Sequence, residues 1–305
     1  MAIDVKTLTG YVDEQRLPLI KKAVLNAKSA QLFNLQTGVK SKAALNLLST
    51  EVVFGDGSSC GWNEAGTSTL SQREIEVGKI KINMSFCDRT LLDTWAGYEV
   101  KVAAGKEKLP FEEYFVNSVI ENVNAKIEKT IWQGNTTDSD ADEQAFDGLL
   151  TILGNENGVI SAGSTGATAT VFDVYANIPA EVLDKASIVM GTDSFRELVL
   201  DLMQQNLYHY NPVIDGEMQI TLPGTSTKVY GVNGLNGTDK VVAGDLQGNF
   251  FFGTDMEGDA EVFDLWYSKD NQEFRLAIKF NAGVQVAFPD QVVVGTISAD
   301  SDGNG

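Results

Sequence analysis

The residue types that could support catalysis are few and widely separated in this 305-residue sequence. The segment Gly57–Gly61 matches the pattern G-x-S-x-G of serine hydrolases and places Ser59 at the position of the nucleophile. Such a serine must lie between a strand and a helix, but residues 62–71 are polar and typical of a loop. The single histidine, His209, would have to act as the base. The sequence therefore predicts no enzyme, with a serine hydrolase using Ser59 as an unfavoured alternative.

Acidic residues offer one incomplete metal-binding pattern. Asp138, Asp140 and Asp142 have the spacing of a calcium-binding loop. However, Glu143 occupies the position that requires glycine, and Leu149 occupies that of the bidentate glutamate. A solvated acidic loop explains this segment better, so we expect no metal site and no cofactor.

The strongest structural signal is a long helix over Leu109–Gln133. Pro110 suits its first turn, and Gly134 provides a stop. Apolar residues recur at every fourth position, at Phe111, Phe115, Val119, Val123, Ile127 and Ile131. At 1.5 Å per residue the helix is about 37 Å long. A helix of this length must pack against a sheet or a partner subunit along its whole length.

Two segments predict long strands. Between Arg73 and Phe86 the apolar residues alternate, but the alternation changes phase across Gly78–Lys79, which predicts a bulge in a bent hairpin arm. Between Ala260 and Phe288 two alternating runs flank the turn residues KDNQ, which predicts a long hairpin.

The rest of the chain predicts shorter elements. Helices are expected at Val174–Leu183 and Asp193–Gln205, and strands at Ser187–Met190, Lys228–Val232 and Val241–Gly244. Residues 135–153 and 161–170 are expected to be loops, because they are rich in small and polar residues.

Composition indicates a folded protein whose charge is unevenly distributed. The formal net charge is −19, yet residues 1–50 carry seven Lys and Arg against three Asp and Glu. The remaining 255 residues carry 16 basic and 39 acidic residues, a net −23, which argues against a dedicated nucleic-acid binder. No apolar run approaches the length of a membrane span. Cys60 and Cys87 are too few for a disulfide framework.

The order of these elements resembles that of the major capsid proteins of tailed bacteriophages, which have the Hong Kong 97-like fold. Residues 60–86 (CGWNEAGTSTLSQREIEVGKIKINMSF) look like the extended loop of that family, and KIEKTIWQGN (126–135) with AFDGLL (145–150) looks like the end of its spine helix. ASIVMGTDSFRELVLDL (186–202) is similar to a strand and helix of the axial domain. VVAGDLQGNFFFG (241–253) and FRLAIKFNAGVQVAFPDQVVV (274–294) resemble the closing strands and the peripheral hairpin.

The resemblance implies an α+β fold with four parts. These are an N-terminal arm at 1–50, an extended loop hairpin at 51–90, a peripheral domain at 91–160 and 261–305 with the spine helix at 109–133, and an axial domain at 161–260.

The resemblance further implies a structural protein that assembles with itself, as pentamers and hexamers, into an icosahedral shell around double-stranded DNA. Separate scaffolding and portal proteins are the expected partners, without a membrane. The expected location is the virion, assembled in the host cytoplasm, and an encapsulin-type compartment is the alternative. The residues expected to serve self-assembly are Leu19, Ile20, Trp62, Glu64, Gly78 and Trp132.

Overall fold

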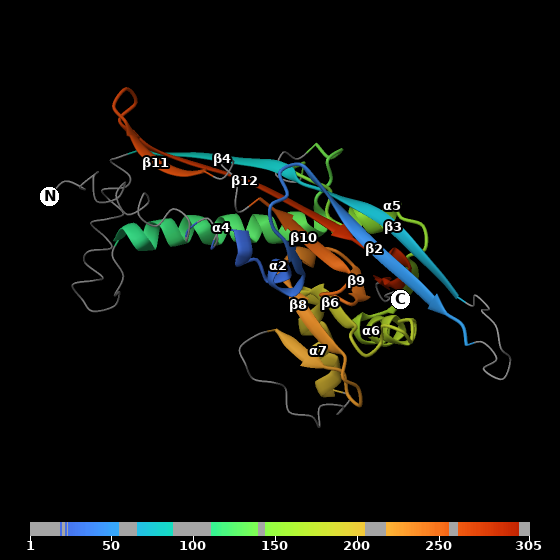
Figure 1. Ribbon diagram of the computed structural model, residues 1–305. Helices are drawn as coiled ribbons and strands as arrows, with labels where there is room; N and C mark the ends of the chain where they lie inside the picture. Colours follow the sequence, from blue (N-terminus) through green and yellow to red (C-terminus); the bar gives the residue numbers. More distant parts are fainter. Residues whose placement is uncertain are drawn as a thin grey trace.

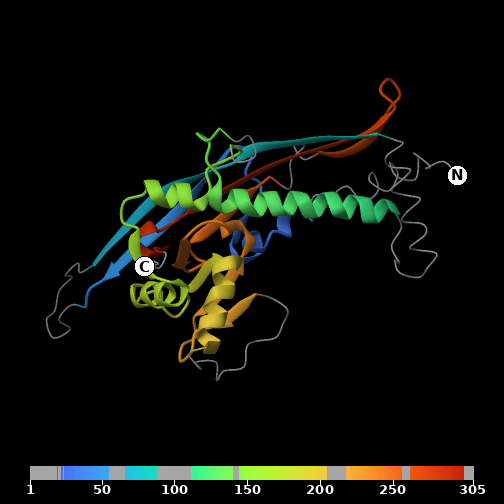
Figure 2. The same cartoon turned by 180° about the vertical axis from the view of Figure 1, so that it is seen from behind.

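The computed structural model describes residues 19, 22, 24–54, 66–87, 111–139, 144–204, 218–255 and 262–298. Its longest elements run side by side: helix α4 (Phe111–Gln133) lies beneath strands β4 (Gly78–Cys87), β11 (Val262–Ser268) and β12 (Glu273–Val286) (Figure 1). A layer of shorter strands with helices α6 (Ala167–Ala176) and α7 (Thr192–Gln204) lies on the other side of α4. The molecule is therefore elongated, with a two-stranded ribbon projecting at one end and the β11–β12 turn at the other (Figure 2).

Helix α4 and the long sheet bury one shared core, as the two sequence periods predict. Val119, Val123, Ile127 and Ile131 of the helix are buried. The alternating residues of β12 that face the helix are buried too, at Phe274, Leu276, Ile278 and Phe280. The predicted spine helix is thus confirmed over Phe111–Gln133, and the predicted terminal hairpin is confirmed by the antiparallel pairing of β11 with β12. Residues 109–110 lie outside the described residues.

The long sheet is assembled around β12. Its order is β1 (Asn34–Gln36), β10 (Phe250–Thr254), β12 and β11, and β4 pairs with the opposite side of β12 over Gly78–Cys87. None of the helices in the described part has the length and apolar character needed to cross a membrane.

The extended hairpin differs from the prediction in its boundaries. It consists of β2 (Lys42–Val52) and β3 (Gly66–Glu76), which pair from Lys42 with Glu76 to Val52 with Gly66. The first strand therefore begins inside the segment assigned to the arm, and β4 leaves the hairpin for the long sheet. The change of phase marks this change of partner: Ile75 and Val77 are buried with Leu45 on one side, whereas the following strand faces α4.

Gly78 lies where β3 gives way to β4, but for a different reason than the predicted bulge. Its backbone does not have the positive φ that favours glycine. Instead, a Cβ atom built on Gly78 would overlap the carbonyl group of Ala145 and crowd Phe146. Glycine is required here because the segment that follows α4 crosses directly over the strand.

We expect Gly78→Ala to lower the free energy of unfolding by about 1–3 kcal/mol, the usual cost of overpacking. The matched control is Gly154→Ala in helix α5 (Leu149–Asn155), where an added Cβ meets nothing within 4 Å. That change should be neutral or slightly stabilising, because alanine is the better helix former. Urea unfolding of both variants measures the difference. Equal stability of Gly78→Ala and the wild type would contradict the crossing of Ala145 over β4.

The six-stranded sheet has the order β5 (Ile160–Thr165), β13 (Val293–Ser298), β9 (Lys240–Gly244), β6 (Ser187–Gly191), β8 (Lys228–Val232) and β7 (Gln219–Thr221). The predicted strands β6, β8 and β9 and the predicted helix α7 are confirmed to within one residue at each end. Two strands do not follow the expected domain boundaries. Strand β10 lies in the segment expected to form the axial domain but joins the long sheet, and β13 lies in the segment expected to form the peripheral domain but joins the six-stranded sheet.

The expected loop at 161–170 is wrong: the segment forms most of β5 and the start of α6. Its small residues serve close packing. A Cβ on Gly163 would crowd the backbone of Thr296, and one on Gly295 would overlap Val174 of α6. The expected loop at 135–153 likewise contains the first residues of α5.

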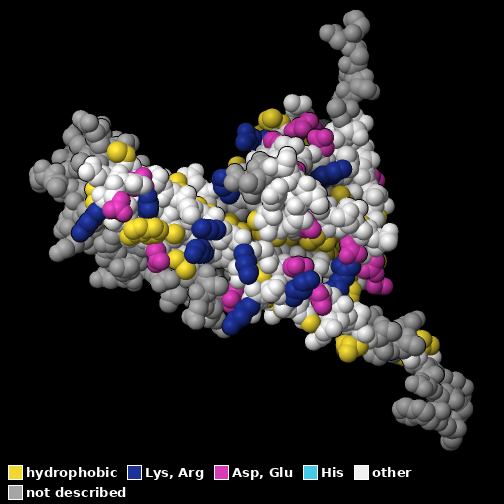
Figure 3. Space-filling view, turned by 90° about the horizontal axis from the view of Figure 1, so that it is seen from above, with side chains coloured by type: hydrophobic (Ala, Val, Ile, Leu, Met, Phe, Trp, Pro, Cys, Tyr) yellow, Lys and Arg dark blue, Asp and Glu magenta, His cyan; other side chains and the backbone are white. Residues whose placement is uncertain are grey.

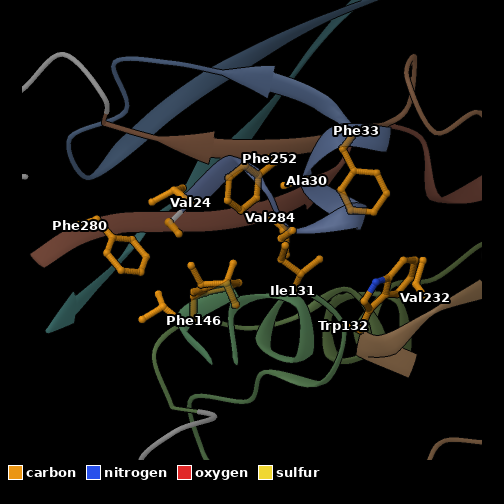
Figure 4. Packing of buried hydrophobic residues seen from close by; sticks show 14 of the residues in the cluster. Val24, Ala30, Phe33, Ile131, Trp132, Phe146, Val232, Phe252, Phe280 and Val284 are labelled. Carbon is orange, nitrogen blue, oxygen red and sulfur yellow. The ribbon is translucent and has the colours of Figure 1, made fainter. Parts of the chain in front are cut away.

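The segment around Leu19 belongs to the body of the subunit. Leu19, Val24 and Ala27 are buried in the same core as α4, and Phe33 stacks on Phe250 with ring centroids 5.5 Å apart. Figure 4 shows Val24 and Phe33 in this core together with Ile131 and Trp132 of α4. Leu19 was expected to serve self-assembly as part of the N-terminal arm at 1–50. The structure corrects that assignment, since α4 and β10 provide the remaining core.

Candidate assembly surfaces

The described residues hold no group of three or more His, Cys, Asp or Glu side chains placed to bind a metal ion. Ser59 and His209, on which the hydrolase alternative depends, lie outside the described residues, as do Asp140 and Asp142. The described part contains a buried polar junction and several exposed apolar surfaces.

The buried junction joins the N-terminal segment to the spine helix. Ser29, in helix α2 (Lys28–Leu32), donates from its backbone N–H to Glu128 Oε2 at 2.9 Å and from its hydroxyl to Oε1 at 2.6 Å. Trp132, one turn later in α4, donates from Nε1 to the Ser29 hydroxyl at 2.6 Å. The Trp132 ring packs edge-on against Phe33, with centroids 5.7 Å apart. Trp132 is therefore a core residue that connects α2 to α4, not a surface contact.

Burial raises the pKa of the Glu128 carboxyl above its ordinary value of 4.5. The hydrogen bonds from Ser29 and the nearby Lys28 ammonium group act in the opposite direction and do not cancel the effect. Lys28 itself donates to the Gly231 carbonyl oxygen at 3.1 Å, so the junction reaches the six-stranded sheet. Helix α2, the spine helix α4 and the six-stranded sheet thus meet around the buried carboxylate of Glu128.

A raised pKa in the folded state means that protonation of Glu128 favours folding. Wild-type stability relative to Glu128→Gln should therefore rise as pH falls through the raised pKa toward 4.5, and this gain should be absent above that pKa. Urea unfolding of both proteins from roughly pH 8 to pH 5 measures the difference. Glu121→Gln, at an exposed position two turns earlier in α4, is the matched control for the removal of one carboxylate from this helix. A constant difference between wild type and Glu128→Gln would contradict the burial of this carboxyl.

The extended hairpin exposes an apolar pair near its tip. Leu48 and Leu70 face each other across β2 and β3 and are 64% and 75% exposed. The next pair on the same face is polar, Asn46 with Gln72. Phe54, just beyond β2, is 97% exposed. An isolated two-stranded ribbon gains little stability from such side chains in water, so they are suited to contact with another surface.

The base of the hairpin is held firmly. Arg73 of β3 forms a 2.7 Å ion pair with Glu156, just after α5, and donates to the Val286 carbonyl oxygen of β12 at 2.8 Å. On the other face of the ribbon, Leu45 and Leu47 are buried against the body. The hairpin is therefore anchored at its base, while the outer half of its described part presents Leu48 and Leu70 to solvent.

The opposite end of the molecule has a second surface of this kind. Trp266 of β11 is 43% exposed and lies opposite Arg275, which is paired with Glu273 at 2.8 Å. Together with Met84 these residues line a cavity of about 370 Å³. Aromatic residues, arginine and methionine are enriched at protein–protein interfaces.

The structure brings together only part of the predicted assembly set. Leu19 and Trp132 lie in the main core, and Gly78 lies under Ala145. Ile20, Trp62 and Glu64 lie outside the described residues and remain predictions. Sequence reasoning missed the pair Leu48 and Leu70. Leu70 stands in a polar stretch of β3, but Leu48 directly follows Leu47 in β2. The pair becomes recognisable only once the register places the two leucines opposite each other.

The arrangement of spine helix, long sheet, extended hairpin and mixed six-stranded sheet is the Hong Kong 97-like fold of tailed-phage capsid proteins, which confirms the predicted fold. The structure is similar to a subunit of the satellite phage P4 procapsid that includes the size determination (Sid) protein, with TM-score 0.61, 13% identity and coverage of 93% of this chain and 91% of that one. It is also similar to the capsid of an empty GTA particle, with TM-score 0.58, 11% identity and coverage of 91% and 90%.

A third similar structure is a virus-like particle from Pyrococcus furiosus, with TM-score 0.51, 7% identity and coverage of 92% of this chain and 97% of that one. No protein-family model matches the sequence, and no curated protein matches it either. The structural neighbours are shell proteins, and at these identities the likeness establishes the fold.

Proposed function

We propose that this protein is a major capsid protein that assembles, as pentamers and hexamers, into an icosahedral shell enclosing double-stranded DNA. One observation carries the proposal: the subunit has the fold of shell proteins, and it leaves apolar side chains in solvent on ribbons at both of its ends. A shell built from many copies gives each of those surfaces a neighbour.

The assembly mechanism follows from the rigid body and the anchored hairpin. Burying one exposed leucine contributes about 1.5–3 kcal/mol, so each contact between subunits can be modest. Because every subunit makes the same contacts repeatedly, the closed shell becomes stable although individual contacts remain weak enough to be corrected during assembly. The six-stranded sheet with α6 and α7 would gather around the pentamer and hexamer axes as the axial domain.

The negative net charge of the chain bears on how the shell would contact packaged DNA. A subunit with net charge −19 does not attract DNA electrostatically, so contact with packaged DNA would be loose and non-specific. We therefore propose that separate scaffolding and portal proteins direct assembly and that the shell is filled after it forms. The finished protein would reside in the virion, after assembly in the host cytoplasm.

The alternative is an encapsulin-type compartment that encloses protein cargo, and the similarity to a virus-like particle from Pyrococcus furiosus is compatible with it. The deciding experiment is to purify particles from the source cells, treat them with nuclease and analyse their contents. Nuclease-resistant double-stranded DNA of uniform length is the result that we expect. Particles that contain protein cargo and no DNA would contradict the DNA-filled shell and support the compartment.

A further inference from the structure

Strand β4 forms an edge of the long sheet. Its one partner among the described strands is β12, which it pairs over Gly78–Cys87. Alternate residues of an antiparallel strand direct their backbone N–H and C=O groups away from the partner, so the outer edge of β4 presents a row of groups able to pair with another strand.

A groove follows this edge. Its volume is about 350 Å³, and it lies between β4, the spine helix α4 and the segment that crosses over Gly78. Half-buried Ile80 and Ile82 of β4 line it together with Val123 and Ile127 of α4. Lys126 and Thr130 of α4 and Gln144 line it as well, so the wall beside the open edge is apolar in part and can receive both apolar and polar side chains of an added strand.

The solvent side of the same edge is basic. Lys79 and Lys81 are exposed, and Lys81 lies directly opposite Lys279 of β12. No ion pair joins these three lysines to an acidic residue in the described part of the chain. Figure 3 shows several Lys and Arg side chains across the middle of the molecule, with Asp and Glu side chains among them. Like charges directly opposite each other destabilise a sheet, so this arrangement costs free energy in the isolated subunit and gains from an acidic neighbour.

We propose that this groove, bounded by Lys79–Ile82 and α4, receives an extended acidic segment of a second copy of this chain, which adds a strand to the edge of β4. In a strand the side chains alternate between the two faces. The segment would therefore place apolar residues against Ile80 and Ile82 and acidic residues beside Lys79 and Lys81. Main-chain hydrogen bonds would supply affinity, and the lysines would set specificity.

A second copy is the partner that best fits this chemistry. Residues 51–305 carry 39 acidic against 16 basic residues, a net −23, so a neighbouring copy offers many more carboxylates than cations. Nucleic acid would complement the lysines but would use neither the apolar wall nor the row of backbone groups. The inference rests on the proposed function, because it requires copies to lie side by side in a shell.

The experiment uses particles assembled from a mixture of ¹⁵N-labelled and unlabelled full-length subunits. A carbodiimide joins lysine amines directly to carboxylates that contact them, and mass spectrometry identifies the joined peptides. We expect cross-links from Lys79 or Lys81 to Asp or Glu peptides that combine one labelled and one unlabelled copy. Cross-links confined to single copies, or none from these lysines, would overturn the proposal.

Variants give an independent result. Lys79→Glu with Lys81→Glu should lower the particle yield by about tenfold or more, because repulsion replaces attraction at the interface. Lys40→Glu with Lys129→Glu makes the same change in net charge at two exposed lysines outside the groove and outside the six-stranded sheet, and should assemble normally. If the first pair fails to fold by circular dichroism, Lys79→Gln with Lys81→Gln takes its place. Equal loss in the control pair, or normal particles from the groove variants, would overturn the proposal.

Two further outcomes separate this inference from the proposed function and from DNA binding. Wild-type protein that forms no particles would overturn the proposed function, whereas normal particles from the groove variants would overturn the groove alone. Lysine acetylation measures occupancy: protection of Lys79 and Lys81 in DNA-free particles supports a protein strand. Protection that appears only when DNA is present would overturn the proposal in favour of nucleic acid.

Discussion

Trp132→Ala should lower the free energy of unfolding of the subunit by about 3–5 kcal/mol, the usual cost of removing a buried aromatic side chain. The ring is fully buried between Phe33 and the helical turn at Gly234, where a Cβ on the glycine would overlap it. The change also leaves the Ser29 hydroxyl without its donor. Urea or thermal unfolding of the unassembled subunit measures the loss.

Two variants separate the causes of this effect. Trp132→Phe keeps most of the volume and removes the hydrogen bond to Ser29, so it should cost about 1–3 kcal/mol. Trp266→Ala removes the same side chain at the exposed end of β11 and should change subunit stability by less than about 1 kcal/mol. Equal effects of Trp132→Ala and Trp266→Ala would contradict the position of Trp132 in the core.

The second large effect concerns assembly. Leu48→Asn with Leu70→Gln copies the adjacent polar pair, Asn46 with Gln72, onto the tip of the extended hairpin. Particle yield should fall at least about tenfold, because each buried leucine contributes about 1.5–3 kcal/mol at every contact in the shell. Subunit stability should stay unchanged, since both leucines are exposed in the isolated subunit.

The control for this pair is Asn46→Gln with Gln72→Asn, which exchanges the two amides in the next row of the same face. Particle yield by size-exclusion chromatography and electron microscopy should remain that of the wild type. Normal particles from the leucine variant would show that the hairpin tip makes no contact in the shell. Loss of stability in that variant would instead place the leucines in the core of the subunit.

The sequence predicted those elements whose burial pattern repeats with a single period. Helix α4 packs one face against β12 for most of its length, so Val119, Val123 and Ile127 recur at helical spacing. Strand β12 alternates without interruption from Phe274 to Phe280 for the same reason. Short apolar strands such as β6 were also found, because both faces are covered and the whole run is apolar.

Predictions failed where the partner of an element determines its structure. Strand β5 and helix α6 contain many small residues, which allow these elements to pack closely against β13. Composition alone favours a loop there. Strand β2 mixes polar and apolar residues on both faces, so the sequence did not indicate that it begins at Lys42, where it pairs with β3. Leu19 is buried against residues of α4 that are far away in the sequence, so the sequence alone did not show that it belongs to the core of the subunit.

The assembly surfaces were the least predictable feature. A residue such as Leu70 becomes a candidate only when the register with Leu48 and the exposure of both are known. Similarly, the three lysines along β4 and β12 form one basic row only because Lys81 and Lys279 are paired across the sheet. The resemblance of the whole chain to capsid proteins predicted self-assembly, but the fold was needed to locate the surfaces.

The most direct test of the account is electron microscopy of the purified full-length protein, combined with analytical ultracentrifugation at low and high salt. The account predicts pentamers, hexamers or closed shells of uniform size, because the hairpin tip and the edge of β4 require neighbouring copies. A stable monomer at micromolar concentration under both salt conditions would contradict it.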